Sequence, residues 1–299
     1  MPMKIKKNMS ILAQFKDCSF HNFDCEIEIT GTDFTWGELS GSMVLATARK
    51  YFVQATKNPK VACIIAPELF TETTKSVLIT SEASALFHQL HNDFIYEEQL
   101  VEHFISEQAN ISPRAHICSP VHIDNDVTIE AGAYIGANTI LESGVYIGPN
   151  CTIGTEGMLP KMVKDKKIHI KHFGGVKIKS GSHIHANSNV SRALHFSGLT
   201  QIGEQCHVGI GVNIAHDVVI GDRTEISGHT NIAGRTTIGE NVWIGANSTL
   251  SNHLHIGDNA KIRLGSTVIE SIAADEDVSG NFALSHQQNL RLYLSSKLK

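Results

Sequence analysis

The sequence predicts a mainly β chain whose larger part is a parallel β-helix. An aliphatic residue recurs at every sixth position over most of the 299-residue chain. The residue after it is often Gly, and a small or β-branched residue stands four places after it. An amphipathic helix has a period of 3.6 residues and a lone strand a period of 2, so a strict period of six indicates a solenoid of short strands and turns.

The aliphatic positions fall in two runs. The first is Ile111, Ile117, Ile123, Ile129, Ile135, Leu141, Ile147 and Ile153. The second is Ile178, Ile184, Val190, Phe196, Ile202, Val208, Ile214, Ile220, Ile226, Ile232, Ile238, Ile244, Leu250, Ile256, Ile262 and Val268. Three hexads make one triangular coil, and successive coils stack about 4.8 Å apart. Residues 18 apart in the second run, which keeps its phase throughout, are therefore expected to stack on one face, namely Ile178, Phe196, Ile214, Ile232 and Leu250.

The hexads divide the chain into three parts. Residues 1–105 lack them and are expected to form a small α/β domain, with strands at 61–66 and 76–80 and a helix beginning at Ala83. Residues 106–270 form the β-helix, which an excursion at 154–176 interrupts. Residues 271–299 form a tail with a short closing helix, indicated by leucines at every fourth position, Leu290, Leu294 and Leu298. Such a cap covers the exposed core and strand edges of the last coil.

Composition narrows the functional classes. A net charge of −5 gives no sign of nucleic-acid binding, and no apolar stretch approaches the length of a membrane span. The N-terminus is a poor signal peptide, so the expected location is the cytoplasm. The six Cys residues show no paired metal-ligand spacing, and we predict no metal site.

Register brings a possible reaction centre together at one corner of the coil. His216, Gly234 and Asn252 each stand two places after an aliphatic of the same stack, so they are expected to lie one above another. His253, next to Asn252, is two coils from His216, about 10 Å away at the strand spacing. A His can take a proton from an attacking amine near neutral pH, and an outward N–H of Gly234 can stabilise an oxyanion.

The sequence at this corner resembles one enzyme family. Residues 213–222, Asn-Ile-Ala-His-Asp-Val-Val-Ile-Gly-Asp, resemble the catalytic-His segment of the UDP-3-O-acylglucosamine N-acyltransferases of lipid A biosynthesis (LpxD), which are left-handed β-helix enzymes. The turn at 232–234 resembles their oxyanion hole, and residues 251–253 resemble the segment with a second functional His. The resemblance implies a left-handed coil, His216 as general base, Gly234 N–H as oxyanion donor, and His253 as a residue that orients the donor's phosphopantetheine or the substrate.

The resemblance extends to the first domain and to the substrates. Residues 29–31 and 49–51 resemble parts of the family's uridine-binding domain, which implies that residues 1–105 bind the nucleotide-sugar acceptor and that Tyr51 stacks on the base. Ala48 stands where the family usually has the Asn that hydrogen-bonds the base. The implied reaction is transfer of a (3-hydroxy)acyl group from an acyl carrier protein thioester to the amine of a nucleotide-linked amino sugar, without a tightly bound cofactor.

The expected assembly is a homotrimer with its active sites between subunits. Asn252 is a candidate substrate contact at its own corner, and His229 is a candidate on a face that could meet a neighbour's active corner. Lys161, Lys164 and Lys166 in the basic excursion are candidates for binding the acidic acyl carrier protein or a donor phosphate.

Three alternatives stay open at the level of sequence. Coenzyme A could replace the carrier protein, with another nucleotide-linked amino sugar as acceptor in the synthesis of a surface polysaccharide. The chain could also be a non-catalytic solenoid that binds a nucleotide or partner. A γ-type carbonic anhydrase uses the same coil, but it needs two His five residues apart, a spacing that no pair of His has in this sequence.

Overall fold

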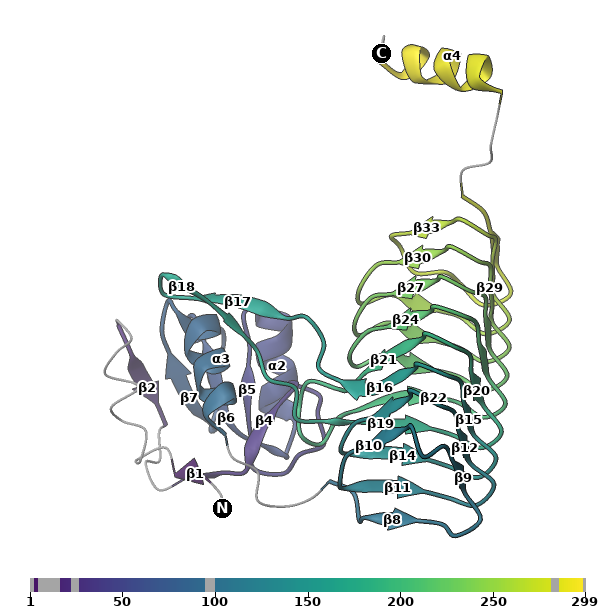
Figure 1. Ribbon diagram of the computed structural model, residues 1–299. Coiled ribbons are helices and arrows are strands. Elements are labelled where there is room, and N and C mark those ends of the chain that lie inside the picture. The colour runs from purple at the N-terminus through teal and green to yellow at the C-terminus, as the bar shows by residue number, and fades with distance from the viewer. Residues whose placement is uncertain (1–2, 5–16, 23–26, 95–99, 281–284, 298–299) are drawn as a thin grey trace.

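The computed structural model describes residues 3–4, 17–22, 27–94, 100–280 and 285–297. A small α/β domain lies beside a long three-sided coil, and a helix follows the last coil (Figure 1). The strands of the hexads pair in parallel in three sheets that run the length of the coil. The predicted fold class, a left-handed parallel β-helix with a small N-terminal α/β domain, is confirmed.

Each sheet forms one face of the coil and takes every third strand. The first face contains β10 (His116–Ile117), β13 (Tyr134–Ile135), β16 (Thr152–Thr155), β21 (Asn189–Ser191), β24 (Asn213–Ile214), β27 (Asn231–Ile232), β30 (Thr249–Leu250) and β33 (Thr267–Val268). The second face contains β8 (Phe104–Ile105), β11 (Val121–Ile123), β14 (Thr139–Leu141), β19 (Gly175–Ile178), β22 (Leu199–Ile202), β25 (Val219–Ile220), β28 (Thr237–Ile238) and β31 (His255–Ile256). The third face contains β9 (Asn110–Ile111), β12 (Thr128–Ile129), β15 (Tyr146–Ile147), β20 (His183–Ile184), β23 (His207–Val208), β26 (Glu225–Ile226), β29 (Trp243–Ile244), β32 (Lys261–Ile262) and β34 (Asp277–Val278).

The hexad explains the core of the coil. Apart from Phe196, the hexad positions from Ile123 onward are buried in one continuous cluster, and each contributes roughly 1.5–3 kcal/mol of burial free energy. The small residue of the hexad fills the corner. Where it carries a hydroxyl, as at Ser182 and Thr224, the hydroxyl donates to a carbonyl of a neighbouring coil, at 2.6 Å to Gly203 and 2.9 Å to Gly239. These buried polar groups are therefore satisfied within the stack.

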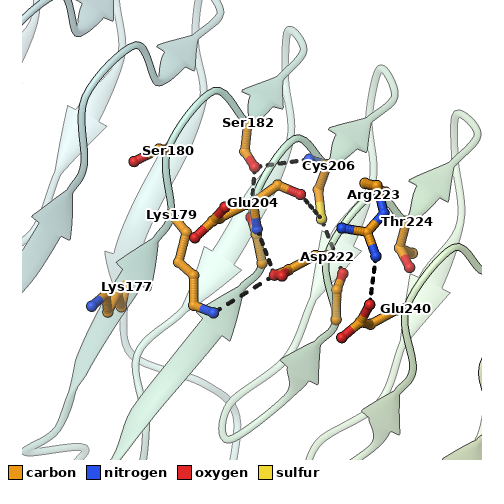
Figure 2. Close-up of polar contacts among 12 residues, drawn as sticks. Lys177, Lys179, Ser180, Ser182, Glu204, Cys206, Asp222, Arg223, Thr224 and Glu240 are labelled. Atoms are coloured by element: carbon orange, nitrogen blue, oxygen red, sulfur yellow. Dashed lines mark hydrogen bonds and ion pairs between the residues drawn. The ribbon is translucent and has the colours of Figure 1, made fainter.

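Polar contacts also link successive coils on the outside (Figure 2). Lys179 pairs with Asp222 at 3.6 Å, and the same carboxylate accepts the Glu204 N–H at 2.8 Å. At the same corner, Arg223 forms an ion pair with Glu240 of the next coil. Exposed pairs of this kind contribute about 0–1 kcal/mol each, so the buried stack, not this ladder, holds the coil together.

One predicted stack is wrong. Ile178 pairs with Ile202, 24 residues later rather than 18, and Val190 pairs with Ile214 in the same way. Residues 192–198 leave the coil as a loop between β21 and β22, so neither Phe196 nor Ile178, which lies on the second face, is a member of the stack that contains Ile214 on the first face. Because the extra loop is one period long, the phase of the hexad is the same before and after it. Ile214, Ile232 and Leu250 do stack as expected.

The N-terminal domain is a sheet in the order β2 (Ser19–His21), β7 (Ser76–Ile79), β6 (Val61–Ala66), β5 (Ser42–Leu45) and β4 (Gly31–Asp33). Only β2 runs antiparallel. Alternate residues of β5, β6 and β7 pack against α2 (Arg49–Lys57) or against α3 (Ala83–Asp93), so the two helices cover opposite faces. A short antiparallel pair, β1 (Met3–Lys4) with β3 (Glu28–Ile29), is separate from this sheet.

The excursion joins the two parts of the molecule. It forms an antiparallel hairpin, β17 (Pro160–Val163) with β18 (Lys166–His169), which lies across α3 (Figure 1). Val163 and Ile168 pack into the core on the α3 side of the sheet. Asn92 at the end of α3 donates to the His169 carbonyl at 2.8 Å and accepts the Lys171 N–H at 3.0 Å. The N-terminal domain is thus attached to the middle of the coil.

The described coil extends from β8 to β34, a few residues beyond the expected limits of 106 and 270 at each end. The tail contains one helix, α4 (His286–Lys297), as the spacing of the leucines indicated. Leu290 and Leu294 are 48% and 51% exposed, so α4 does not bury them against the last coil. Leu298 lies outside the described residues.

Candidate active site

The predicted corner is present in the structure. His216, Gly234 and Asn252 follow β24, β27 and β30, which are neighbours on the first face. The Arg235 N–H donates to the His216 carbonyl at 3.0 Å, and the His253 N–H donates to the Gly234 carbonyl at 3.2 Å. Each turn is therefore hydrogen-bonded to the turn of the coil before it.

His216 forms a dyad with Asp217. The Nδ1 atom of His216 is 2.7 Å from Asp217 Oδ2, and the two side chains are only 12% and 10% exposed. The carboxylate also accepts the Leu194 N–H at 3.2 Å, while the Asp217 N–H donates to Thr200 Oγ1 at 2.9 Å. A carboxylate at Nδ1 favours the tautomer with a proton on that nitrogen, which leaves Nε2 as the acceptor. Nε2 can thus accept a proton from a group that binds beside it.

Gly234 lies directly against the acceptor nitrogen. A Cβ atom at this position would be 2.9 Å from His216 Nε2 and 3.0 Å from its Cε1, so only Gly fits beside the ring. No described residue accepts a hydrogen bond from the Gly234 N–H. A free backbone amide beside a general base is the arrangement that stabilises the oxyanion of an acyl-transfer intermediate.

The other side of the dyad is covered by the excursion. The His172 ring meets the His216 ring edge-on, with centroids 5.1 Å apart, and Gly157 packs against both rings. His172 is 2% exposed, and burial lowers its pKa to about 4. A neutral, buried ring therefore packs against His216 on that side.

A cavity of about 300 Å³ lies beside this corner, between the N-terminal domain and the coil. Its domain wall contains an aromatic group in which Phe34 and Trp36 stack at 4.9 Å, with Tyr51 at 6.4 Å from Trp36. From the coil, Arg235 and His253 complete the wall. The cavity therefore joins an aromatic platform to the corner that holds Gly234.

The aromatic loop is held in place by one carboxylate. Asp33, at the end of β4, accepts the N–H of Phe34 at 2.8 Å and that of Leu39 at 2.9 Å, and it also accepts the Ser197 hydroxyl at 3.3 Å. A side chain at Gly37 would collide with this carboxylate. Burial raises the pKa of Asp33, while its N–H and O–H donors favour the ionised form.

Buried histidines fix the N-terminal domain against the coil. His195, from the loop at 192–198, has its Nδ1 atom 3.1 Å from Thr32 Oγ1. The same hydroxyl contacts His91 Nδ1, and His91 Nε2 is 2.8 Å from the Lys171 carbonyl. Burial lowers the pKa of His91 to about 4 and that of His195 well below its usual range, so both rings are neutral at pH 7.

The other site residues predicted from the sequence lie partly in this cavity and partly outside it. Tyr51 and Lys161 line the cavity, whereas Lys164 and Lys166 lie at the tip of the hairpin and not with Lys161 in the cavity. Asn252 and His253 are exposed at the predicted corner. The Arg235 Nη1 atom lies 3.4 Å from His253 Nε2.

His229 lies on a different corner of the coil, in a left-handed turn (φ 58°) against Gly211. Whether it meets a neighbouring subunit stays a prediction.

Sequence reasoning missed the cavity residues Phe34, Trp36 and Arg235. Arg235 follows Gly234 directly, so its position next to the turn at 232–234 was a signal for a cation at this corner. Phe34 and Trp36 stand in a stretch without a repeat, so nothing in their spacing indicated a shared wall. Asp217 was part of the segment that shows the resemblance, but its role as the partner of His216 follows only from the 2.7 Å contact.

Comparison with known proteins identifies the repeat. The family "Bacterial transferase hexapeptide (six repeats)" matches residues 126–156, 199–234 and 235–270. All three matched segments lie within residues 106–270, the expected bounds of the coil. The unmatched residues 157–198 contain the excursion and the inserted loop. This match supports the predicted class of enzyme, an acyltransferase. No curated protein matches the chain.

Solved structures with a similar coil include three UDP-N-acetylglucosamine acyltransferases. The one from Francisella novicida is 18% identical over 63% of this chain and 71% of its own, with a TM-score of 0.51. Those from Bacteroides fragilis and Campylobacter jejuni are 26% and 20% identical, over 56% and 61% of this chain and 68% and 81% of their own, with TM-scores of 0.44 and 0.47. The first likeness shows the shared fold.

No helix among the described residues is long and apolar enough to cross a membrane. Within the same residues, no group of three or more His, Cys, Asp or Glu is arranged to hold a metal ion.

Proposed function

We propose that the protein transfers an acyl group from a thioester to the amine of a nucleotide-linked amino sugar. The observation that supports this most is the His216–Asp217 dyad, whose Nε2 lies beside Gly234, a residue whose N–H no described residue accepts. A base beside an oxyanion donor suits addition of a nucleophile to a carbonyl. The transferase repeats of the coil agree with this chemistry.

The reaction follows from the positions of these groups. As the sugar amine attacks the thioester carbonyl, His216 Nε2 takes a proton from the nitrogen, and the Gly234 N–H stabilises the oxyanion. Asp217 stabilises the imidazolium that forms at His216. The tetrahedral intermediate then collapses, the C–S bond breaks, and the imidazolium protonates the departing thiolate. The products are an amide and a free thiol, and the base returns to its neutral form.

The cavity supplies a place for the acceptor. Its aromatic wall of Phe34, Trp36 and Tyr51 suits a stacked base, and its coil wall includes Arg235, which follows Gly234 in the chain. Base–aromatic stacking contributes about 1–3 kcal/mol and does not require a particular base. This agrees with Ala48, which offers no hydrogen bond to a base, at the start of α2.

The donor we favour is a 3-hydroxyacyl chain on acyl carrier protein, as in the lipid A step of the resembling family, with the reaction taking place in the cytoplasm. We assign the exposed His253 to the phosphopantetheine arm and the exposed Asn252 to the substrate, and the basic hairpin tip with Lys164 and Lys166 offers charge to an acidic carrier. The working form is a homotrimer in which a neighbour completes the acyl groove. Light scattering that gives the mass of one chain at assay concentrations would contradict the shared site.

The test is a matrix of thiol-release assays on purified protein. Acyl carrier protein and coenzyme A donors are paired with 3-O-acylated UDP-glucosamine and with simpler nucleotide amino sugars. Turnover with the carrier protein and acylated UDP-glucosamine would place the chain in lipid A synthesis. Turnover only with coenzyme A or another sugar would favour surface-polysaccharide synthesis. If nucleotide binds but no pair releases thiol, the coil is a binding protein and the proposal fails.

A further inference from the structure

Arg235 has an unusual conformation for its residue type. It adopts left-handed backbone angles (φ 63°) at the turn after β27. Asn fills the matching turn position at Asn241 and Asn247, with φ of 54° and 58°. Asn tolerates this conformation better than a long side chain does. The backbone thus gives no reason for Arg here, and the reason has to lie in what its side chain does.

The guanidinium of Arg235 is a half-buried cation that feels the charge of Asp217 but forms no ion pair with any described residue. Its Nε atom is fully buried and has no hydrogen-bond partner, and burial lowers the pKa of the group. The guanidinium lies 4.8 Å above the Phe34 ring. No described residue offers it an ion pair. A desolvated charge is unfavourable unless it is paired, so this site is incomplete without an anion.

The two nearby carboxylates cannot serve as that anion. Asp217 is bonded to His216 Nδ1 and to the Leu194 N–H. Asp33 is bonded to two backbone N–H groups and the Ser197 hydroxyl. Both carboxylates are therefore held by other donors, and neither forms an ion pair with Arg235.

The cavity wall around Arg235 is positive. Lys161 also lines it, and no described residue forms an ion pair with Lys161 either. The cavity histidines add no charge at pH 7, because burial lowers the pKa of His88 to about 4 and also lowers that of His253. Two fixed cations thus face a cavity whose single lining carboxylate, Asp33, is already satisfied.

We propose that Arg235 and Lys161 form an anion site that binds the diphosphate of the nucleotide-linked acceptor. The inference rests on the proposed function and specifies its substrate contact. The Arg235 guanidinium lies over the Phe34 ring, and its backbone directly follows Gly234 in the chain. A phosphate bound there lies between the aromatic wall and the reacting corner. That order matches a nucleotide sugar, in which the diphosphate separates the base from the sugar.

The phosphate of the donor's phosphopantetheine offers the same charge as the diphosphate of the acceptor. Binding experiments distinguish these two ligands of the anion site. Calorimetry measures UDP, uridine and 4′-phosphopantetheine against the wild-type chain without any turnover. We expect UDP to bind at least about tenfold more tightly than uridine, because charge-assisted hydrogen bonds are roughly twice as strong as neutral ones. Equal affinity for UDP and uridine, or a clear preference for phosphopantetheine, overturns the assignment.

Arg235→Gln is the decisive variant, because Gln205 already adopts the same left-handed turn (φ 52°) in this coil. It should reduce the preference for UDP over uridine about tenfold and leave uridine affinity unchanged. Lys161→Gln should have a smaller effect in the same direction, and it tests the site on a different element of the fold. A full UDP preference retained by both variants refutes the proposal.

Arg223→Gln is the matched control. Arg223 has the same left-handed backbone (φ 57°) but forms an ion pair with Glu240 on the outside of the coil (Figure 2). This variant should bind UDP as the wild type does. If the wild type prefers UDP and Arg235→Gln does not, yet no thioester is consumed, the anion site stands and the proposed reaction fails. If acyl transfer occurs but the wild type shows no preference for UDP over uridine, the proposed reaction stands and the anion site fails.

Discussion

Replacing Gly234 by Ala tests whether the corner beside His216 is the reaction centre. The added Cβ would lie 2.9 Å from His216 Nε2, 3.0 Å from Cε1 and 3.1 Å from the His216 carbonyl oxygen. All three separations are below ordinary carbon contacts, so the ring has to move. It cannot move freely, because Nδ1 is held by Asp217 at 2.7 Å and the other side packs on His172.

The expected consequence is a large loss of rate with a moderate loss of stability. Displacing a catalytic group by about 1 Å can lower a rate about 100-fold, which equals about 2.7 kcal/mol of activation free energy. Overpacking costs about 1–3 kcal/mol of folding free energy. We therefore expect kcat to fall at least about 100-fold in a chain that still unfolds cooperatively.

The control is Gly228→Ala. Gly228 occupies the same place in its hexad, but there only the Ile210 carbonyl oxygen would be near, at 3.0 Å. Rates are measured by thiol release, and thermal unfolding and light scattering establish that both variants fold and assemble. Gly234→Ala with a rate within threefold of Gly228→Ala would refute the assignment of this corner.

Three further expectations concern single groups. Asp217→Asn should lower kcat at least about 100-fold with little change in KM, because it removes the charge that stabilises the His216 imidazolium; a larger effect on KM than on kcat would contradict this. Trp36→Ala should weaken UDP binding about 5- to 150-fold by loss of stacking, and calorimetry that shows no loss would remove Trp36 from the base site. Burial holds the pKa of His88 and His172 near 4, so the unfolded chain, with ordinary values near 6.5, binds more protons between these pH values. Thermal stability should therefore be full above about pH 6.5 and fall as pH drops towards 4, less steeply in His172→Phe, and a flat profile would contradict the buried neutral rings.

The coil could be predicted from the hexad because every turn buries the same kind of side chain at the same position. A buried aliphatic at every sixth residue fixes both the strand and the corner, so the stack of His216 over Gly234 followed from counting. For the same reason, the loop at 192–198 could not be detected from the spacing of the aliphatic residues. An insertion of one full period preserves the phase, and only the pairing of Ile178 with Ile202 reveals it.

The N-terminal side of the site was not predictable in this way. Phe34 and Trp36 come from the loop after β4, whereas Arg235 comes from the coil about 200 residues later, and no periodicity links them. Their meeting depends on how the domain docks. That docking uses His195 from the inserted loop, Thr32 from β4 and the excursion, which are all departures from the repeat.

The central claim is that His216 acts as the base in acyl transfer to a sugar amine. Mass spectrometry of the nucleotide sugar after incubation with an acyl thioester tests it most directly, with wild type, His216→Ala and the surface control Arg223→Gln side by side. We expect an acylated, amide-linked product from the wild type and the control, and at least about 100-fold less from His216→Ala. Equal product from His216→Ala, or acyl transfer to water alone by the wild type, would contradict the account.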